Sequence, residues 1–230
     1  MKAIIPAAGI GQRMGLATPK QYLKLAGRTV LEHSVLRLLA AHQIEQVIIA
    51  LHPADTTFPQ LPLASWPQVS VVTGGATRAD SVLAALQSPS LADPETLVVV
   101  HDAARPGLPR DCLQALLTQA TEAPSVGAML ALPAYDTVKQ GRAGQVVQTL
   151  PRETIWLAQT PQVFQAGSLR LALQAAVGQG KLVTDEAHAM ELQGYQPALV
   201  MGSRRAMKLT TPEDLPLLEF FLQQELKQEL

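Results

Sequence analysis

Short apolar runs alternate along the first half of the chain with longer stretches in which apolar side chains recur every three or four positions. The apolar runs predict buried strands at residues 3–5, 46–51, 69–72 and 97–100. The helical spacing predicts one helix that starts after Thr29 and a second over residues 79–86. Thr29 followed by Glu32 forms a capping box, which marks the start of the first helix. This alternation favours the α/β class: a Rossmann-like, mostly parallel sheet with helices on both faces.

The second half of the chain continues this pattern with one interruption near Pro133. Two strand-like pieces, residues 135–139 and 145–150, have glycines between them and predict a β-hairpin. On either side of it we expect a helix after Pro109, a strand at 126–132, helices at 168–177 and 184–193, a strand at 198–201 and a final helix from residue 211. We expect one domain over residues 1–230, with residues 134–156 as a hairpin arm. Because an isolated hairpin is marginally stable, we expect the arm to pack against a second copy in a homodimer.

The composition excludes several classes of protein. The 230 residues include 18 basic and 19 acidic side chains, and a net charge of −1 disfavours a general nucleic-acid-binding protein. Cys112 is the one cysteine, which excludes a disulfide framework and a cysteine-rich metal site and is typical of the cytoplasm. The sequence shows neither a signal-peptide pattern nor an apolar stretch of membrane length. We therefore expect a cytoplasmic protein with no nucleic-acid or membrane partner.

The loop after the first strand is rich in small residues and reads Pro6-Ala7-Ala8-Gly9-Ile10-Gly11-Gln12-Arg13-Met14-Gly15. Small side chains let backbone N–H groups approach a ligand closely. A dinucleotide-binding fingerprint needs glycine at Met14, and a P-loop needs Gly-Lys at Met14-Gly15, so both motifs fail on spacing. A tight turn and an anion-binding loop remain, and the nearby cations Arg13 and Lys20 favour the anion site.

This loop, with Pro19-Lys20-Gln21-Tyr22-Leu23 and Gly27, resembles the signature of the sugar nucleotidyltransferases. Four further segments make the chain similar to the 2-C-methyl-D-erythritol 4-phosphate cytidylyltransferase family: Gly74-Gly75 with Arg78-Ala79-Asp80-Ser81-Val82, His101-Asp102-Ala103-Ala104-Arg105-Pro106, Asp136-Thr137-Val138-Lys139 and Thr184-Asp185-Glu186-Ala187. The segments occur in family order, between Ala3 and about Glu219. The resemblance implies an enzyme of the non-mevalonate isoprenoid pathway. Such an enzyme joins CTP and 2-C-methyl-D-erythritol 4-phosphate to give 4-diphosphocytidyl-2-C-methyl-D-erythritol and pyrophosphate.

The resemblance also implies roles for individual residues. The expected catalytic residues are Arg13, Lys20, Arg152 and Lys208, and Arg152 is expected to reach the substrate phosphate of the partner subunit. The expected nucleotide-binding residues are Pro6, Ala7, Ala8, Gly9, Gly11, Gly75, Ala76, Arg78 and Ser81. The expected contacts to the sugar-alcohol phosphate are Asp102, Arg105, Thr137, Thr160 and Thr184. We expect Mg²⁺ to be carried mainly by the CTP phosphates, with no protein metal ligand.

The implied chemistry needs no general base. The nucleophile is a phosphate oxygen, and because the second pKa of a phosphate is near 6 it is already ionised at neutral pH. The site must instead overcome repulsion between anions and stabilise charge on the α-phosphate.

Without the resemblance, Thr184 would be a helix N-cap, Thr137 a strand residue, Thr160 a turn residue and Asp102 a turn or helix cap.

Two segments depart from the family pattern and two other functions stay open. Ala76-Thr77 stands where acidic residues are common, and Arg204-Arg205-Ala206 replaces expected acidic and asparagine positions. A ribitol-5-phosphate cytidylyltransferase would share the nucleotide residues and differ around Thr137, Arg152 and Thr184. A nucleotide-binding regulator without catalysis is disfavoured because the four basic residues are retained. A dinucleotide-dependent oxidoreductase is excluded at Met14.

Overall fold

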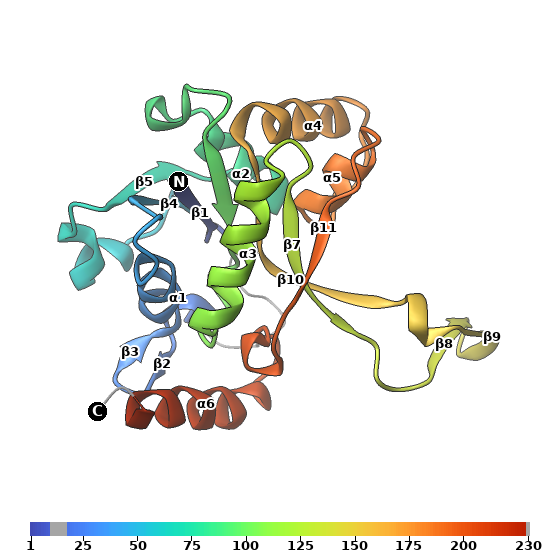
Figure 1. Cartoon of the computed structure of the whole chain (residues 1–230). Helices are drawn as coiled ribbons and strands as arrows, with labels where there is room; N and C mark the ends of the chain where they lie inside the picture. Colours follow the sequence, from blue (N-terminus) through green and yellow to red (C-terminus); the bar gives the residue numbers. More distant parts are fainter. Residues whose placement is uncertain (10–17, 229–230) are drawn as a thin grey trace.

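The computed structural model describes residues 1–9 and 18–228, with side chains as far as residue 224, and in this part of the chain the main sheet has seven strands. The strand order is β11-β7-β10-β6-β1-β4-β5 (Figure 1). In chain order these strands are β1 (Lys2–Pro6), β4 (Gln46–Leu51), β5 (Val69–Thr73), β6 (Leu97–Val100), β7 (Ala128–Pro133), β10 (Trp156–Gln165) and β11 (Ala198–Met201). Strand β10 runs antiparallel to β6 and β7, and the other described pairs of this sheet are parallel. The predicted α/β, Rossmann-like class is confirmed.

Helices cover both faces of the sheet with their apolar sides. In β1, Ala3 and Ile5 face one side and Ile4 the other, and all three side chains are fully buried. Helices α1 (Val30–Leu39) and α3 (Arg110–Glu122) pack on the side of Ala3 and Ile5. Helices α2 (Arg78–Leu86), α4 (Ala166–Gly178) and α5 (Glu186–Glu191) pack on the side of Ile4. Helix α6 (Asp214–Gln228) packs on a small hairpin made of β2 (Lys24–Leu25) and β3 (Arg28–Thr29).

The start of α1 agrees with the side-chain cap predicted from the sequence. The Thr29 hydroxyl accepts a hydrogen bond from Glu32 N at 3.1 Å, and the Glu32 carboxylate accepts one from Thr29 N at 2.7 Å. The last helix, expected from residue 211, begins at Asp214, whose carboxylate accepts hydrogen bonds from the backbone N–H groups of Thr210 and Thr211 just before the helix. At α1 these short-range bonds satisfy backbone donors that have no partner inside the helix, so the local sequence is enough to place its start.

Strand β10 was missed by the hydrophobic pattern, because the polar segment Gln159–Gln162 interrupts its apolar residues. Three of these polar side chains are nevertheless buried, because the surrounding structure provides their hydrogen-bond partners. Gln159 donates to Ser203 O at 2.9 Å, and Gln162 donates to the Asp185 carboxylate at 2.9 Å. These partners are distant in the sequence, so local periodicity could not reveal the strand.

Three other element predictions need correction. The expected helix over residues 184–193 is α5, which begins at Glu186. Its N-cap is Asp185 and not Thr184, because the Asp185 carboxylate accepts from His188 N at 2.9 Å. Strand β8 (Val138–Arg142) begins three residues later than expected, whereas β9 (Gln145–Leu150) matches. The β2–β3 hairpin was not expected, since two-residue strands leave no periodicity.

The β8–β9 hairpin lies at the end of an arm that extends away from the sheet and its helices (Figure 1). Among the described residues, its strands pair with each other and not with the main sheet. Val146 and Val147 on β9 are exposed at 66% and 58%. The placement is compatible with the expected arm at residues 134–156, whose role in dimerisation stays a prediction. Within the described part of the chain, no helix combines the length and apolar character that crossing a membrane requires.

We expect Gly127→Ala to destabilise the fold strongly. Gly127 has φ +77°, and a Cβ atom there would collide with the ring of Phe164 in the core. We expect the free energy of unfolding to fall by about 2–4 kcal/mol in chemical denaturation. Gly178→Ala is the matched control, because a Cβ at Gly178 meets no atom within 4 Å, and its stability should change by less than about 1 kcal/mol. Equal stabilities for the two variants would contradict this prediction.

Candidate active site

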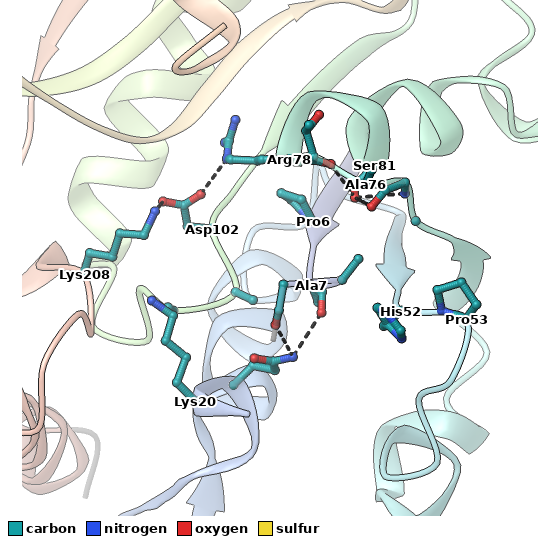
Figure 2. A pocket seen from close by; sticks show the side chains of 18 of the residues that line it. Pro6, Ala7, Lys20, His52, Pro53, Ala76, Arg78, Ser81, Asp102 and Lys208 are labelled. Atoms are coloured by element: carbon teal, nitrogen blue, oxygen red, sulfur yellow. Dashed lines mark hydrogen bonds and ion pairs between the residues drawn. The ribbon is translucent and has the colours of Figure 1, made fainter. Parts of the chain in front are cut away.

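A cleft of about 760 Å³ opens beyond the carboxyl ends of β1, β4, β5 and β6 (Figure 2). Parallel strands bring the loops that follow them to the same edge of the sheet, which is where ligands bind in open α/β folds. The segment after β11 contributes Lys208 and Thr210 to the same cleft. Of the residues expected from the sequence, the cleft brings together Pro6, Ala7, Ala8, Gly9, Lys20, Gly75, Ala76, Arg78, Ser81, Asp102 and Lys208. Gly11 and Arg13 lie outside the described residues.

Small residues form the side of the cleft between the loops after β1 and β5. A Cβ atom at Gly74 would lie 2.7 Å from the Ala8 Cβ and 2.9 Å from the Ser81 hydroxyl oxygen. Gly75 N donates a hydrogen bond to that Ser81 oxygen at 3.2 Å. Glycine is therefore required at position 74 for the two loops to approach each other this closely.

Gln21 supports the first loop and was not expected as a site residue. Its side-chain amide donates to Ala7 O at 3.0 Å and to Gly9 O at 3.4 Å, and its side chain is buried. Figure 2 shows these two bonds below Ala7. Gln21 directly follows Lys20 in one of the segments that carry the family resemblance. This position is the feature of the sequence that could have identified Gln21 as a site residue.

Asp102 is the electrostatic centre of the cleft. Its carboxylate accepts from Arg78 Nε at 3.0 Å, from Lys208 Nζ at 2.8 Å and from Arg105 Nε at 3.4 Å. Burial by itself raises the pKa of a carboxyl, but the three cations outweigh it and hold the pKa of Asp102 well below its usual range. Asp102 is therefore ionised and ion-paired, and is not a simple turn cap.

Glu186 joins this cluster through Arg78. The two terminal nitrogens of Arg78 donate to the two carboxylate oxygens of Glu186 at 2.7 and 2.9 Å. With two carboxylates around its guanidinium, the pKa of Arg78 is raised despite its burial. Glu186 stands in the segment Thr184-Asp185-Glu186-Ala187, which carries the resemblance, but it was not among the expected site residues.

Thr160 lies behind Asp102 and contacts its backbone. The Thr160 hydroxyl accepts from Asp102 N at 3.0 Å and lies 3.1 Å from His101 Nδ1. His101 Nε2 lies 3.1 Å from Arg105 O, and since a carbonyl only accepts, Nε2 carries the proton. Complete burial lowers the pKa of His101 to about 4, so the imidazole is neutral near pH 7. The neutral ring then accepts the Thr160 proton at Nδ1, and Thr160 is more than a turn residue.

The remaining expected catalytic and substrate residues are not part of the lining of the cleft in their own chain. Thr137 and Thr184 are exposed, and neither lines the cleft. Arg152 is in the arm, where its side chain is 54% exposed and donates to Tyr135 O at 2.8 Å. Arg105 is not in the cleft lining either, but it is tied to the cleft by its ion pair with Asp102.

The two segments that depart from the family pattern have structural roles. Thr77 is the N-cap of α2, where its hydroxyl accepts from Asp80 N and the Asp80 carboxylate accepts from Thr77 N. Arg204 lies over the ring of Tyr135 at 4.9 Å from its centre, a cation–π contact between the body and the base of the arm. Ala206 O accepts from Arg105 at 2.7 Å.

The described residues contain no cluster of three or more His, Cys, Asp or Glu side chains that could hold a metal ion. In the cleft lining the acidic side chain is Asp102, and three cations already contact it. Its carboxylate oxygens are the donor type that Mg²⁺ prefers, but a single carboxylate is a partial ligand set. The donors fit a metal that arrives with most of its ligands on phosphates.

The fold is an α/β sheet with its cleft at the carboxyl edge of the parallel strands, and its relatives place it among the nucleotidyltransferases. The family model for 2-C-methyl-D-erythritol 4-phosphate cytidylyltransferase matches residues 1–224, and the chain belongs to this family. The cytidylyltransferase of Salmonella heidelberg is 48% identical over 229 residues, which cover 99% of this chain and 95% of the relative.

Solved structures of cytidylyltransferases with this name share the fold. That of Francisella tularensis is similar with a TM-score of 0.83 and 36% identity, covering 96% of this chain and 98% of the other. That of Thermus thermophilus has a TM-score of 0.79 and 35% identity, covering 96% and 98%. The expected family is confirmed by both kinds of similarity.

We expect the stability of the protein to fall below pH 6.5 because of His101. The unfolded chain binds a proton at His101 near pH 6.5, whereas the folded protein binds it only near pH 4. Between these values the unfolded state holds more protons, so the free energy of unfolding falls as the pH falls. Between pH 7 and pH 5 the loss from this group should be about 2 kcal/mol. Denaturation at both pH values should show a smaller loss in His101→Gln, and an unchanged pH dependence would refute this account.

Proposed function

We propose that this chain is a cytidylyltransferase that joins CTP and 2-C-methyl-D-erythritol 4-phosphate. The products are 4-diphosphocytidyl-2-C-methyl-D-erythritol and pyrophosphate, in the non-mevalonate isoprenoid pathway. The observation that carries this proposal is the convergence of Lys20, Lys208 and Asp102 on one cleft beside a small-residue loop, in a member of this family. The names of the family and of its relatives favour methylerythritol phosphate over ribitol 5-phosphate.

The proposed reaction is an in-line displacement at the α-phosphate of CTP. An oxygen of the sugar-alcohol phosphate forms a bond to the α-phosphorus, and the bond from that phosphorus to the bridging oxygen of pyrophosphate breaks. The attacking oxygen is already ionised, so no side chain needs to remove a proton. The rate then depends on positioning and on positive charge around the α-phosphate. We assign this charge to Lys20 and Lys208, and to Arg13 from the family pattern.

The position of Lys20 supports its assignment. Lys20 precedes the residue that anchors the small-residue loop, and its side chain lies in the cleft (Figure 2). Its ammonium donates to Leu209 O at 2.7 Å, which places it beside the segment that carries Lys208. Two lysines from distant parts of the chain therefore lie on the same side of the cleft, where their charges can act on one triphosphate.

We assign the nucleotide to the loops after β1 and β5. Its proposed contacts are the backbone of Pro6, Ala7, Ala8, Gly9 and Gly11, together with Gly75, Ala76, Arg78 and Ser81. Arg78 would contribute from the start of α2, where two carboxylates hold its guanidinium. With Ala76 in place of an acidic residue, recognition of cytosine would rest on main-chain groups and on the Ser81 hydroxyl. Mg²⁺ would enter on the CTP phosphates.

We assign the sugar-alcohol phosphate to the neighbourhood of Asp102 and Arg105. Thr160 would act there mainly by holding Asp102, since its hydroxyl is already shared between His101 and Asp102 N. Thr184 would contribute from the segment before α5. Thr137 and Arg152, which lie on the arm, would serve the site of a partner subunit in a homodimer. The exposed Val146 and Val147 support burial of the arm in such a dimer, and we propose that the enzyme works in the cytoplasm.

A substrate panel tests the proposed function. We expect the purified protein with Mg²⁺ to release pyrophosphate from CTP with 2-C-methyl-D-erythritol 4-phosphate, and far less with ribitol 5-phosphate. UTP should be a poor substrate and ATP should hardly react, because we assign recognition of the base to main-chain groups and the Ser81 hydroxyl, which would match the hydrogen-bonding pattern of cytosine. Efficient turnover of ribitol 5-phosphate would transfer the assignment to that substrate. Nucleotide binding without turnover would instead favour a regulator.

Subunit mixing tests whether Arg152 acts across the dimer. Arg152→Ala and Lys20→Ala should each be nearly inactive alone, since each removes a cation from every site. If Arg152 serves the partner, a mixed dimer has one site with both defects and one with neither, so about half of its sites regain activity.

The control for this experiment mixes Lys20→Ala with Lys208→Ala. Both lysines lie in the cleft of their own chain, so mixing them should restore nothing. A monomer by light scattering, or no recovery after confirmed subunit exchange, would exclude the shared site.

A further inference from the structure

The guanidinium of Arg78 connects the start of α2 with the carboxylates of Asp102 and Glu186. Arg78 is the first residue of α2 and follows the glycine loop assigned to the nucleotide. Its Nε donates to Asp102 Oδ1 at 3.0 Å, while its two terminal nitrogens donate to Glu186 at 2.7 and 2.9 Å. A guanidinium is a planar and rigid fork. A carboxylate that holds both terminal nitrogens therefore also fixes the direction in which Nε points.

Glu186 lies outside the cleft lining, and its side chain is only 1% exposed. It cannot touch either substrate from this position, so any effect on catalysis must pass through Arg78. Its helix has other anchors: Gln162 accepts from Ala187 N at 2.8 Å and donates to the Asp185 carboxylate at 2.9 Å. Helix α5 therefore does not depend on Glu186 alone for its place in the fold.

The charges of the cluster support a role for Glu186 beyond folding. Arg78, Arg105 and Lys208 all contact Asp102, and Glu186 is the second carboxylate of the group. Three positive and two negative groups leave one net positive charge beside the place assigned to the sugar-alcohol phosphate. Without Glu186 the cluster would have two net positive charges, and the guanidinium would be free to turn from Asp102 toward the phosphates of the substrates.

We propose that Glu186 is a positioning residue for the sugar-alcohol phosphate. Glu186 holds the guanidinium of Arg78, and Arg78 Nε in turn holds Oδ1 of Asp102. The other oxygen, Oδ2, then faces Lys208 Nζ, which lies 2.8 Å from it. This inference rests on the proposed function, in which Asp102 contacts that substrate. It assigns to Glu186 a kinetic role that is separate from nucleotide binding.

The first experiment uses Glu186→Gln, which keeps the size of the side chain and removes its charge. At saturating CTP, we expect kcat/KM for 2-C-methyl-D-erythritol 4-phosphate to fall about tenfold, as for the loss of one charge-assisted hydrogen bond. CTP affinity, measured by direct titration, should stay within about twofold of the wild-type value. Glu191→Gln is the matched control on the same helix, because Glu191 is exposed, and its kinetics should equal those of the wild type.

The second experiment shows whether the effect passes through Arg78. In an Arg78→Met background, Glu186→Gln should cause no further loss of kcat/KM, because the fork that Glu186 holds is absent. Independent, multiplicative losses would overturn the proposal. An equal loss of CTP affinity in Glu186→Gln would also overturn it, since Glu186 would then act through the nucleotide contact of Arg78 or through a general structural defect.

If circular dichroism shows that Glu186→Gln does not fold, Arg78→Lys gives the decisive measurement. Lysine keeps the charge but cannot hold both carboxylates as a fork. We expect the same loss in kcat/KM for the sugar-alcohol phosphate, and native efficiency would overturn the proposal. A wild-type protein that is inactive with CTP and methylerythritol phosphate would overturn the proposed function and this inference together. An active wild type with unimpaired variants would overturn the inference alone.

Discussion

The ionised carboxylate of Asp102 is the constraint around which the cleft is organised. A buried charge is costly unless cations and hydrogen bonds compensate it. Arg78, Arg105 and Lys208 provide the cations, and the Thr160 hydroxyl accepts from the backbone N–H of Asp102. These groups come from α2, the loop after β6, the segment after β11 and β10. Compensation of the buried charge of Asp102 therefore requires that four distant parts of the chain keep these relative positions.

The sheet makes this convergence possible. The carboxyl ends of β1, β4, β5 and β6 lie at one edge, so the loops that follow them share the cleft (Figure 1). Close approach of the first and third of these loops depends on Gly74, where a side chain would collide with Ala8 and Ser81. The antiparallel strand β10 brings Thr160 behind Asp102 and then leads into α4. The architecture thus places small residues on one side of the cleft and charges on the other.

In the cleft, lysine and arginine provide the positive charge, and the buried histidine behind it stays neutral. This arrangement suits a reaction between anions. His101 is fully buried and neutral near pH 7, so it supports Thr160 without adding a proton donor or acceptor to the reacting groups. Positive charge is instead placed on lysine and arginine, which stay protonated throughout the physiological range. For a phosphate nucleophile that needs no deprotonation, fixed positive charge is the useful contribution of the protein.

The sequence by itself determined the α/β class, most of its strands and helices, the cap at Thr29, and the family. These follow from short-range periodicity, from local backbone hydrogen bonding and from motifs in a fixed order. Only the tertiary structure decided that residues 156–165 form a strand, that Gln21 anchors the first loop, and that Glu186 holds Arg78. Each of these depends on partners distant along the chain. A polar side chain such as Gln162 or Glu186 is indistinguishable from a surface residue until the fold brings its hydrogen-bond partner to it.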